Sequence, residues 1–206
     1  MKESVQSFFS ELLAVVLGIV ITFAVQGMID RGHDRKEVRK ALELVRTELN
    51  SNREEIALLK DYLDEEMGSA RFLDENAALV NKLDKLDSLT AATVKYHMGI
   101  IDADVSVAFP HDAQELLKMS SLFQKIGDNN LSMKIIRAYD CCSSITTSIE
   151  NHFKARDAQP ADEVAEWIIV HDPRKYLEYA QVTDIDKAIT AINVFLRRKE
   201  TKTIVL

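Results

Sequence analysis

Apolar residues form one long block near the start of the chain and recur at helical spacing after it. Residues 12–29 read LLAVVLGIVITFAVQGMI, and no other stretch is as long and as apolar. In a helix these 18 residues rise about 27 Å, close to the thickness of a bilayer's hydrocarbon core. Unlike a cleaved secretory signal, the leader before the block is not basic, and the one candidate exit site, around Ala24-Val25-Gln26, fits poorly. We therefore expect residues 1–11 to form a short tail and residues 12–29 a retained transmembrane helix.

After this block the apolar positions alternate in steps of four and three, which is the heptad pattern of packed helices. The series is Val38, Leu42, Val45, Leu49, Asn52, Ile56, Leu59 and Leu63. It predicts one long membrane-proximal helix over residues 30–67 that continues the span and ends at Gly68. The same seam suits a coiled coil between chains or the core face of an antiparallel bundle, and for a single domain it favours the bundle.

The remaining residues, 68–206, predict further helices that pack on the long one. A helix of about 15 residues that contains Phe72, Leu79 and Leu83 can return along it, and the longest later helix covers residues 131–154. Shorter helices begin near Ser88, Asp112, Pro160 and Thr183, and only residues 102–109 suggest an extended segment. The expected fold class is all-α: one N-terminal transmembrane helix that continues into a long helix of a helical-bundle soluble domain.

The predicted span has a polar stripe. Four residues that are polar or lack a large side chain share one helical face, and a small-residue series beside them permits close helix approach: Glu11, Gly18, Thr22 and Gln26, and Ser10, Ala14 and Gly18. Either Glu11 and Gln26 simply lie in the two headgroup layers, or the span self-associates with the stripe facing its neighbours or a narrow pore. The pattern leaves both interpretations open.

Basic residues predict the orientation of the span. Five of them follow it and one precedes it, Lys2; the five are Arg31, Arg35, Lys36, Arg39 and Lys40. This asymmetry places the C-terminal domain in the cytoplasm and the protein in the inner (cytoplasmic) membrane, with the five side chains contacting lipid headgroups. Residues 41–206 hold 20 basic and 28 acidic side chains, so we expect no nucleic-acid partner.

Three segments together show a resemblance to a known family. They are the anchor Glu11-Leu-Leu-Ala-Val-Val-Leu-Gly-Ile-Val, the charged helix RKALELVRTELNSNREEI, and ELLKMSSLFQKIGDNNLSMKIIRAYD with its Gly-containing turn. The chain resembles a family of uncharacterised bacterial single-pass membrane proteins, although it has Gly27-Met28 where that family has an Asn-Trp pair. The resemblance implies a topology and brings no established activity.

Few residues suggest chemistry. Helical phosphohydrolases hold divalent metals with a His, a His-Asp pair and a distant Asp, and His152, His171, Asp172 and Asp186 could be placed in that order. The His-Asp pairs are equally explained as helix boundaries. We expect no catalytic, metal or cofactor site, packing roles for Cys141 and Cys142, and solvent exposure for Glu54, Glu55, Glu65 and Glu66.

These patterns favour a non-enzymatic, self-associating membrane protein whose cytoplasmic helical domain controls the packing of the spans. Such a protein could be an ion-conducting or membrane-disrupting effector, or a scaffold for a partner. Two alternatives from other classes are a membrane-tethered metal-dependent hydrolase that uses the His-Asp groups, and a sensor that binds a ligand in the bundle. The sequence identifies no protein partner.

Overall fold

The computed structural model describes the backbone of residues 2–103, 105–179 and 182–200, and the side chains of residues 33–103, 105–178 and 182–197. Within these ranges the chain is all-helical, without a β-strand, which confirms the predicted fold class at that level. In order the elements are α1 Lys2–Glu75, α2 Ala77–Val80, η1 Leu83–Lys85, α3 Ser88–Ile101, α4 Asp112–Met119, α5 Leu122–Ile126, α6 Asn129–Asp157, α7 Val164–Val170, α8 Lys175–Tyr179 and α9 Thr183–Glu200.

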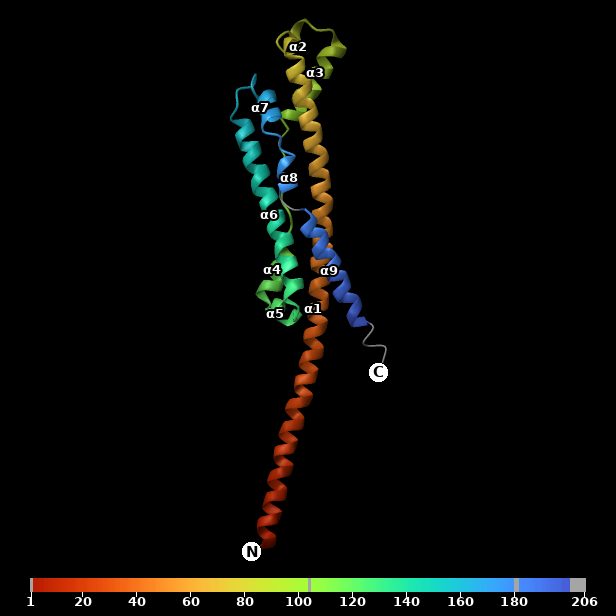
Figure 1. The fold of residues 1–206 in the computed structure, drawn as a ribbon, viewed down its shortest axis with the longest axis vertical. Helices are drawn as coiled ribbons and strands as arrows, with labels where there is room; N and C mark the ends of the chain where they lie inside the picture. The colour runs from red at the N-terminus through yellow and green to blue at the C-terminus, as the bar shows by residue number, and fades with distance from the viewer. Residues whose placement is uncertain (1, 104, 180–181, 201–206) are drawn as a thin grey trace.

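Helix α1 is the axis of the molecule. It runs unbroken for 74 residues, about 110 Å at 1.5 Å per residue. Its N-terminal part extends alone beyond the other helices, which gather around its C-terminal half (Figure 1). The buried part of α1 that is described begins at Val38. The N-terminal part of α1, which we call the bare rod, therefore extends beyond the bundle, and the rest of α1 forms the centre of the bundle.

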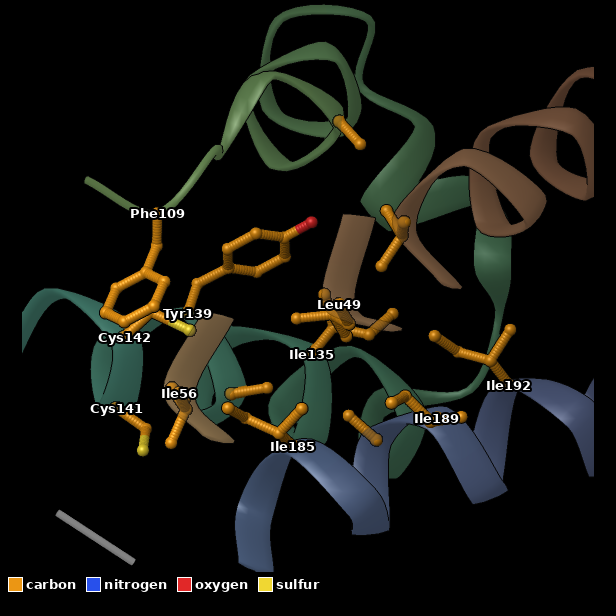
Figure 2. Close-up of a cluster of buried hydrophobic side chains, with 14 of the residues drawn as sticks. Leu49, Ile56, Phe109, Ile135, Tyr139, Cys141, Cys142, Ile185, Ile189 and Ile192 are labelled. Carbon is orange, nitrogen blue, oxygen red and sulfur yellow. The ribbon is translucent and has the colours of Figure 1, made fainter. Parts of the chain in front are cut away.

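The predicted seam faces the chain's own helices. Every member from Val38 to Leu63 is buried, including Asn52, and its apolar members share one core cluster with α4, α5, α6 and α9. Figure 2 shows Leu49 and Ile56 of α1 beside Ile135 of α6 and Ile185 of α9. The structure thus confirms the intramolecular bundle and not a coiled coil between chains over this stretch.

Side-chain bonds establish how the long helices align. Helices α1 and α6 run parallel, because Lys125 just before α6 bonds Asp34, Tyr139 bonds Glu48 and Arg156 bonds Glu66, each pair 90 or 91 residues apart. Helix α9 runs antiparallel to α1, because Asn193 pairs with Arg46 while Asp186 pairs with Arg53. The residue of α1 with which a side chain pairs therefore gives the position of that side chain along the long axis of the bundle.

Two apolar cores follow one another along α1. The larger extends from Val38 to Leu63, and the smaller begins at Met67 and includes Ala70, Leu73 and residues of α3 and α7. A polar layer at Glu66 lies between them in the sequence of α1. The bundle is therefore divided into two apolar parts joined by buried charge.

The prediction that Gly68 ends the long helix was wrong, since α1 continues to Glu75. A glycine inside a helix costs about 1 kcal/mol relative to alanine. Here the next turns bury Ala70 and Leu73 in the smaller core, and this packing outweighs the local cost.

Two other predicted helices are interrupted. The expected returning helix after Phe72 is replaced by α2 and η1, and the Asn76 side chain donates to the Phe72 carbonyl, which competes with continued helix. The segment after Asp112 breaks into α4 and α5 at Ser121, whose φ of 55° is left-handed. As predicted, α3 begins at Ser88 and α9 begins at Thr183. Gly127, in a left-handed conformation, ends α5.

Candidate functional site

The polar layer is the densest group of buried charge in the described part of the chain. Three side chains form it: Glu66 from α1, and His152 and Arg156 from α6. The side chains of Glu66 and His152 are 0 % exposed and that of Arg156 is 5 % exposed. Because α1 and α6 run parallel at an offset of about 90 residues, these positions meet at the same height.

Arg156 holds the layer together. Its Nη1 donates to Glu66 Oε1 at 3.0 Å, while Nη2 donates to Asp157 Oδ1 at 2.9 Å and to the Ala103 carbonyl at 3.2 Å. Burial alone would lower the pKa of Arg156, but its hydrogen bonds to Asp157 and Glu66 raise it. The guanidinium also lies 4.8 Å from the ring centre of Phe153, a cation–π contact.

His152 is enclosed by aromatic rings. The centres of Trp167 of α7 and Tyr176 of α8 lie 5.1 and 5.9 Å from its imidazole. Its Nε2 is 3.6 Å from Glu66 Oε2, too long for a hydrogen bond, and neither ring nitrogen has a protein partner. The short α7–α8 segment therefore covers this histidine with apolar surface.

This arrangement suits structure better than catalysis. Its titratable groups have no exposed face from which a substrate could be reached. Burial raises the pKa of the neighbouring Tyr62, and the Glu66 charge adds to that effect, while its hydroxyl donates to the Ile100 carbonyl at 3.1 Å. The layer crosslinks α1, α6 and the residues that follow α3.

The predicted exposure of Glu66 was wrong, although Glu54, Glu55 and Glu65 are exposed. The signal was present in the sequence, because Glu66 lies three residues after Leu63 and so continues the heptad seam, followed by Ala70 and Leu73. A carboxylate is usually exposed to solvent, but the position of Glu66 in the heptad seam places it inside the bundle. Arg156, its partner, shows the same signal, because it lies four residues after His152 and seven after Ile149 on the apolar seam of α6.

The residues of the hydrolase hypothesis do not converge. His152 and His171 both contact Trp167, at 5.1 and 4.5 Å between ring centres, so the indole lies against both imidazoles. Asp172 pairs with Arg174, which reaches Asp64, whereas Asp186 pairs with Arg53. Arg53 and Asp64 are eleven residues apart on α1, about 16 Å. Within the described residues, no three His, Cys, Asp or Glu side chains are grouped so that they could hold a metal ion.

The two cysteines are packing residues, as predicted. Cys141 and Cys142 are both buried, and no disulfide joins them. Burial, more than any neighbouring charge, raises the pKa of Cys141 to about 12 and that of Cys142 to about 11. Asn52 approaches the Cys142 sulfur at 3.7 Å and donates to the Pro110 carbonyl at 3.0 Å, which holds the chain between α3 and α4 against α1.

The predicted lipid-contact residues lie at the end of the bundle nearest the predicted span. The span positions Ser10, Glu11, Ala14, Gly18, Thr22 and Gln26, and Arg31 after it, lie outside the residues whose side chains are described. Arg35, Lys36 and Lys40 are exposed, and Arg39 pairs with Glu43 at 3.1 Å. Their contact with lipid stays a prediction.

Among the residues with described side chains, no helix is long and apolar enough to span a bilayer. The predicted span, residues 12–29, falls outside that set.

A surface groove of about 570 Å³ lies between the start of α6 and the neighbouring face of α9. Its walls mix both charges with apolar side chains, including Asp128, Lys134, Lys187 and Phe195. This composition selects no class of ligand, so the sensor alternative stays a hypothesis.

No protein-family model matches the chain, and neither the search of curated proteins nor the search of solved structures finds a match. The resemblance to single-pass bacterial membrane proteins therefore stays a prediction.

Proposed function

We propose that this protein is a single-pass inner-membrane protein that self-associates through its span and carries a cytoplasmic helical bundle. One observation supports the proposal above the rest: α1 is a single helix from Lys2 to Glu75. The apolar block of residues 12–29 and the core residues from Val38 onward therefore belong to the same stiff element. A helix of this kind transmits a rotation of the bundle directly to the span.

We assign self-association to the span because the heptad seam of α1 beyond it already packs against helices of the same chain. From Val38 to Leu73 the heptad positions of α1 are buried in the bundle of the same chain. A second chain has no access to them unless the bundle opens. The small-residue series Ser10, Ala14 and Gly18 allows close backbone approach, and it carries the contact between copies.

The bundle then governs how the spans pack. It is much wider than a bare helix and starts soon after the apolar block (Figure 1). Copies can approach only in orientations in which the bundles do not collide, which restricts the spans to a few arrangements. In these the stripe of Glu11, Thr22 and Gln26 faces neighbouring spans, where it forms a polar contact or a narrow pore.

The test uses two glycines of the apolar block. Gly18 belongs to the small-residue series, whereas Gly27 is nine residues later and points to the opposite face, about 180° away. We expect Gly18→Leu to shift the full-length protein in detergent towards the monomer, as measured by light scattering. Gly27→Leu adds the same bulk on the other face and should leave the oligomer unchanged.

A monomeric wild-type protein, or equal oligomer size in both variants, would contradict self-association by this face. Planar-bilayer recordings then distinguish the two forms of the proposal. A cation conductance that falls on Glu11→Gln indicates a pore, because the change removes charge with little change of shape. An assembled but non-conducting protein indicates a scaffold.

A further inference from the structure

The bundle reaches down to the level of the predicted headgroups. Lys125, at the end of α5, bonds Asp34 with an Nζ–Oδ1 distance of 2.8 Å. Asp34 is five residues beyond Ile29, about 7.5 Å along α1. A polar headgroup layer is about 5 to 8 Å thick on each side of the hydrocarbon core. If residues 12–29 span that core, Lys125 lies at the level of the headgroups.

The segment that leads to Lys125 carries unusual apolar exposure, and it descends along α1 from Ala113, whose backbone N–H donates to Glu48. We name residues 116–125, the end of α4 and most of α5, the elbow, because the chain turns there through the left-handed Ser121. Met119 is 85 % exposed, the largest value among the exposed large apolar side chains of the described residues, and Leu116 is 44 % exposed. Lys118 and Lys125 are exposed beside them.

Charge is distributed along α1 in the sense that an anionic surface would favour. Residues 33–40 hold four basic and two acidic side chains, and residues 115–137 at the same end of the bundle also hold four and two. At the far end, residues 54–87 hold ten acidic and four basic side chains. An anionic leaflet attracts the first end, whereas the second begins 25 residues beyond Ile29, about 37 Å along α1, where salt screens the surface field.

We propose that the elbow is a second membrane-contact surface, with Lys125, Lys118 and Met119 against an anionic headgroup layer. This inference rests on the proposed anchor. Exposed apolar side chains flanked by lysines are the pattern by which helices lie on a bilayer surface. The bundle is thus held by the span and by the elbow, which limits its rotation about α1.

The test places one environment-sensitive fluorophore on the full-length protein in anionic nanodiscs. The label is attached at Met119→Cys in the elbow, or at Leu89→Cys on α3 at the far end, where the native side chain is 77 % exposed. A third label at Val20→Cys reports on the apolar block. Cys141 and Cys142 do not compete for the reagent at neutral pH, because both are buried and their thiols have raised pKa values.

We expect headgroup-bound quenchers to quench the label at residue 119 at least about twofold more than the label at residue 89. Replacing the anionic lipid with neutral lipid should reduce that difference. Equal quenching at 119 and 89, with the label at residue 20 quenched from the acyl chains, overturns the elbow contact and keeps the anchor. A label at residue 20 that acyl-chain quenchers do not reach overturns the anchor itself.

Discussion

At the scale of single residues, Glu66 and Arg156 show how a charge is kept inside a bundle. Moving a carboxylate out of water is costly unless a partner compensates it. Arg156 provides that partner at 3.0 Å and shares its remaining donors with Asp157 and the Ala103 carbonyl. Without Arg156, Glu66 would therefore be a buried and uncompensated charge, whereas Arg156 without Glu66 would still pair with Asp157.

Arg156→Met should accordingly cost about 3 to 5 kcal/mol of unfolding free energy, because Glu66 is left charged and buried. Denaturant titration of the detergent-solubilised protein measures the loss. The only tryptophan in the chain, Trp167, packs on His152 in the same layer, and its fluorescence reports the unfolding.

Arg53→Met is the matched control. Like Arg156, Arg53 of α1 pairs with a carboxylate on another helix, Asp186 of α9, at 3.4 Å. Both of these side chains are about half exposed. This pair should contribute about 0 to 1 kcal/mol. Glu66→Gln added to Arg156→Met should recover part of the loss by removing the uncompensated charge. Equal costs at Arg156 and Arg53 would show that Glu66 finds another partner or water.

At the scale of elements, α1 continues through a residue that ordinarily ends helices. Gly68 has helical backbone, an exposed position and nothing within 4 Å of where a Cβ would stand. Gly127, by contrast, ends α5 with φ of +67°, a conformation that residues with a Cβ disfavour. The two glycines therefore have opposite roles.

Gly68→Ala should stabilise the protein by about 1 kcal/mol, because alanine loses less conformational entropy in a helix and meets no neighbour. Gly127→Ala should destabilise it by about 1 to 2 kcal/mol, because the left-handed conformation crowds the new Cβ. Both values come from the same denaturant titration as above. A loss of stability at Gly68 would mean that α1 is kinked or ends there in solution.

At the scale of the whole molecule, the proposed anchor requires that the bundle lie on one defined side of the membrane. The five basic residues after the apolar block favour a cytoplasmic bundle. A reporter that is active only outside the inner membrane, fused after Leu206, should therefore be inactive. A second reporter that is active only in the cytoplasm, fused at the same position, should work. The opposite pair of results would reverse the orientation.

Periodicity along the chain determined which elements form and which of their faces are apolar. The steps of four and three from Val38 to Leu63 identified buried positions correctly, because a helix brings residues three and four apart to one face whatever lies opposite. The boundaries at Ser88 and Gly127 were equally local, since they depend on capping and on a left-handed turn. The apolar block at residues 12–29 is likewise a property of the sequence alone.

Tertiary structure decided everything that depends on contacts between distant segments. It selected the chain's own α6 and α9 as partners of the seam, carried α1 past Gly68, and broke the predicted helices after Phe72 and Asp112. It also buried Glu66 against Arg156, 90 residues away, and placed Lys125 beside Asp34. The physical reason is that a helical repeat specifies a face, whereas the partner of that face depends on long-range packing.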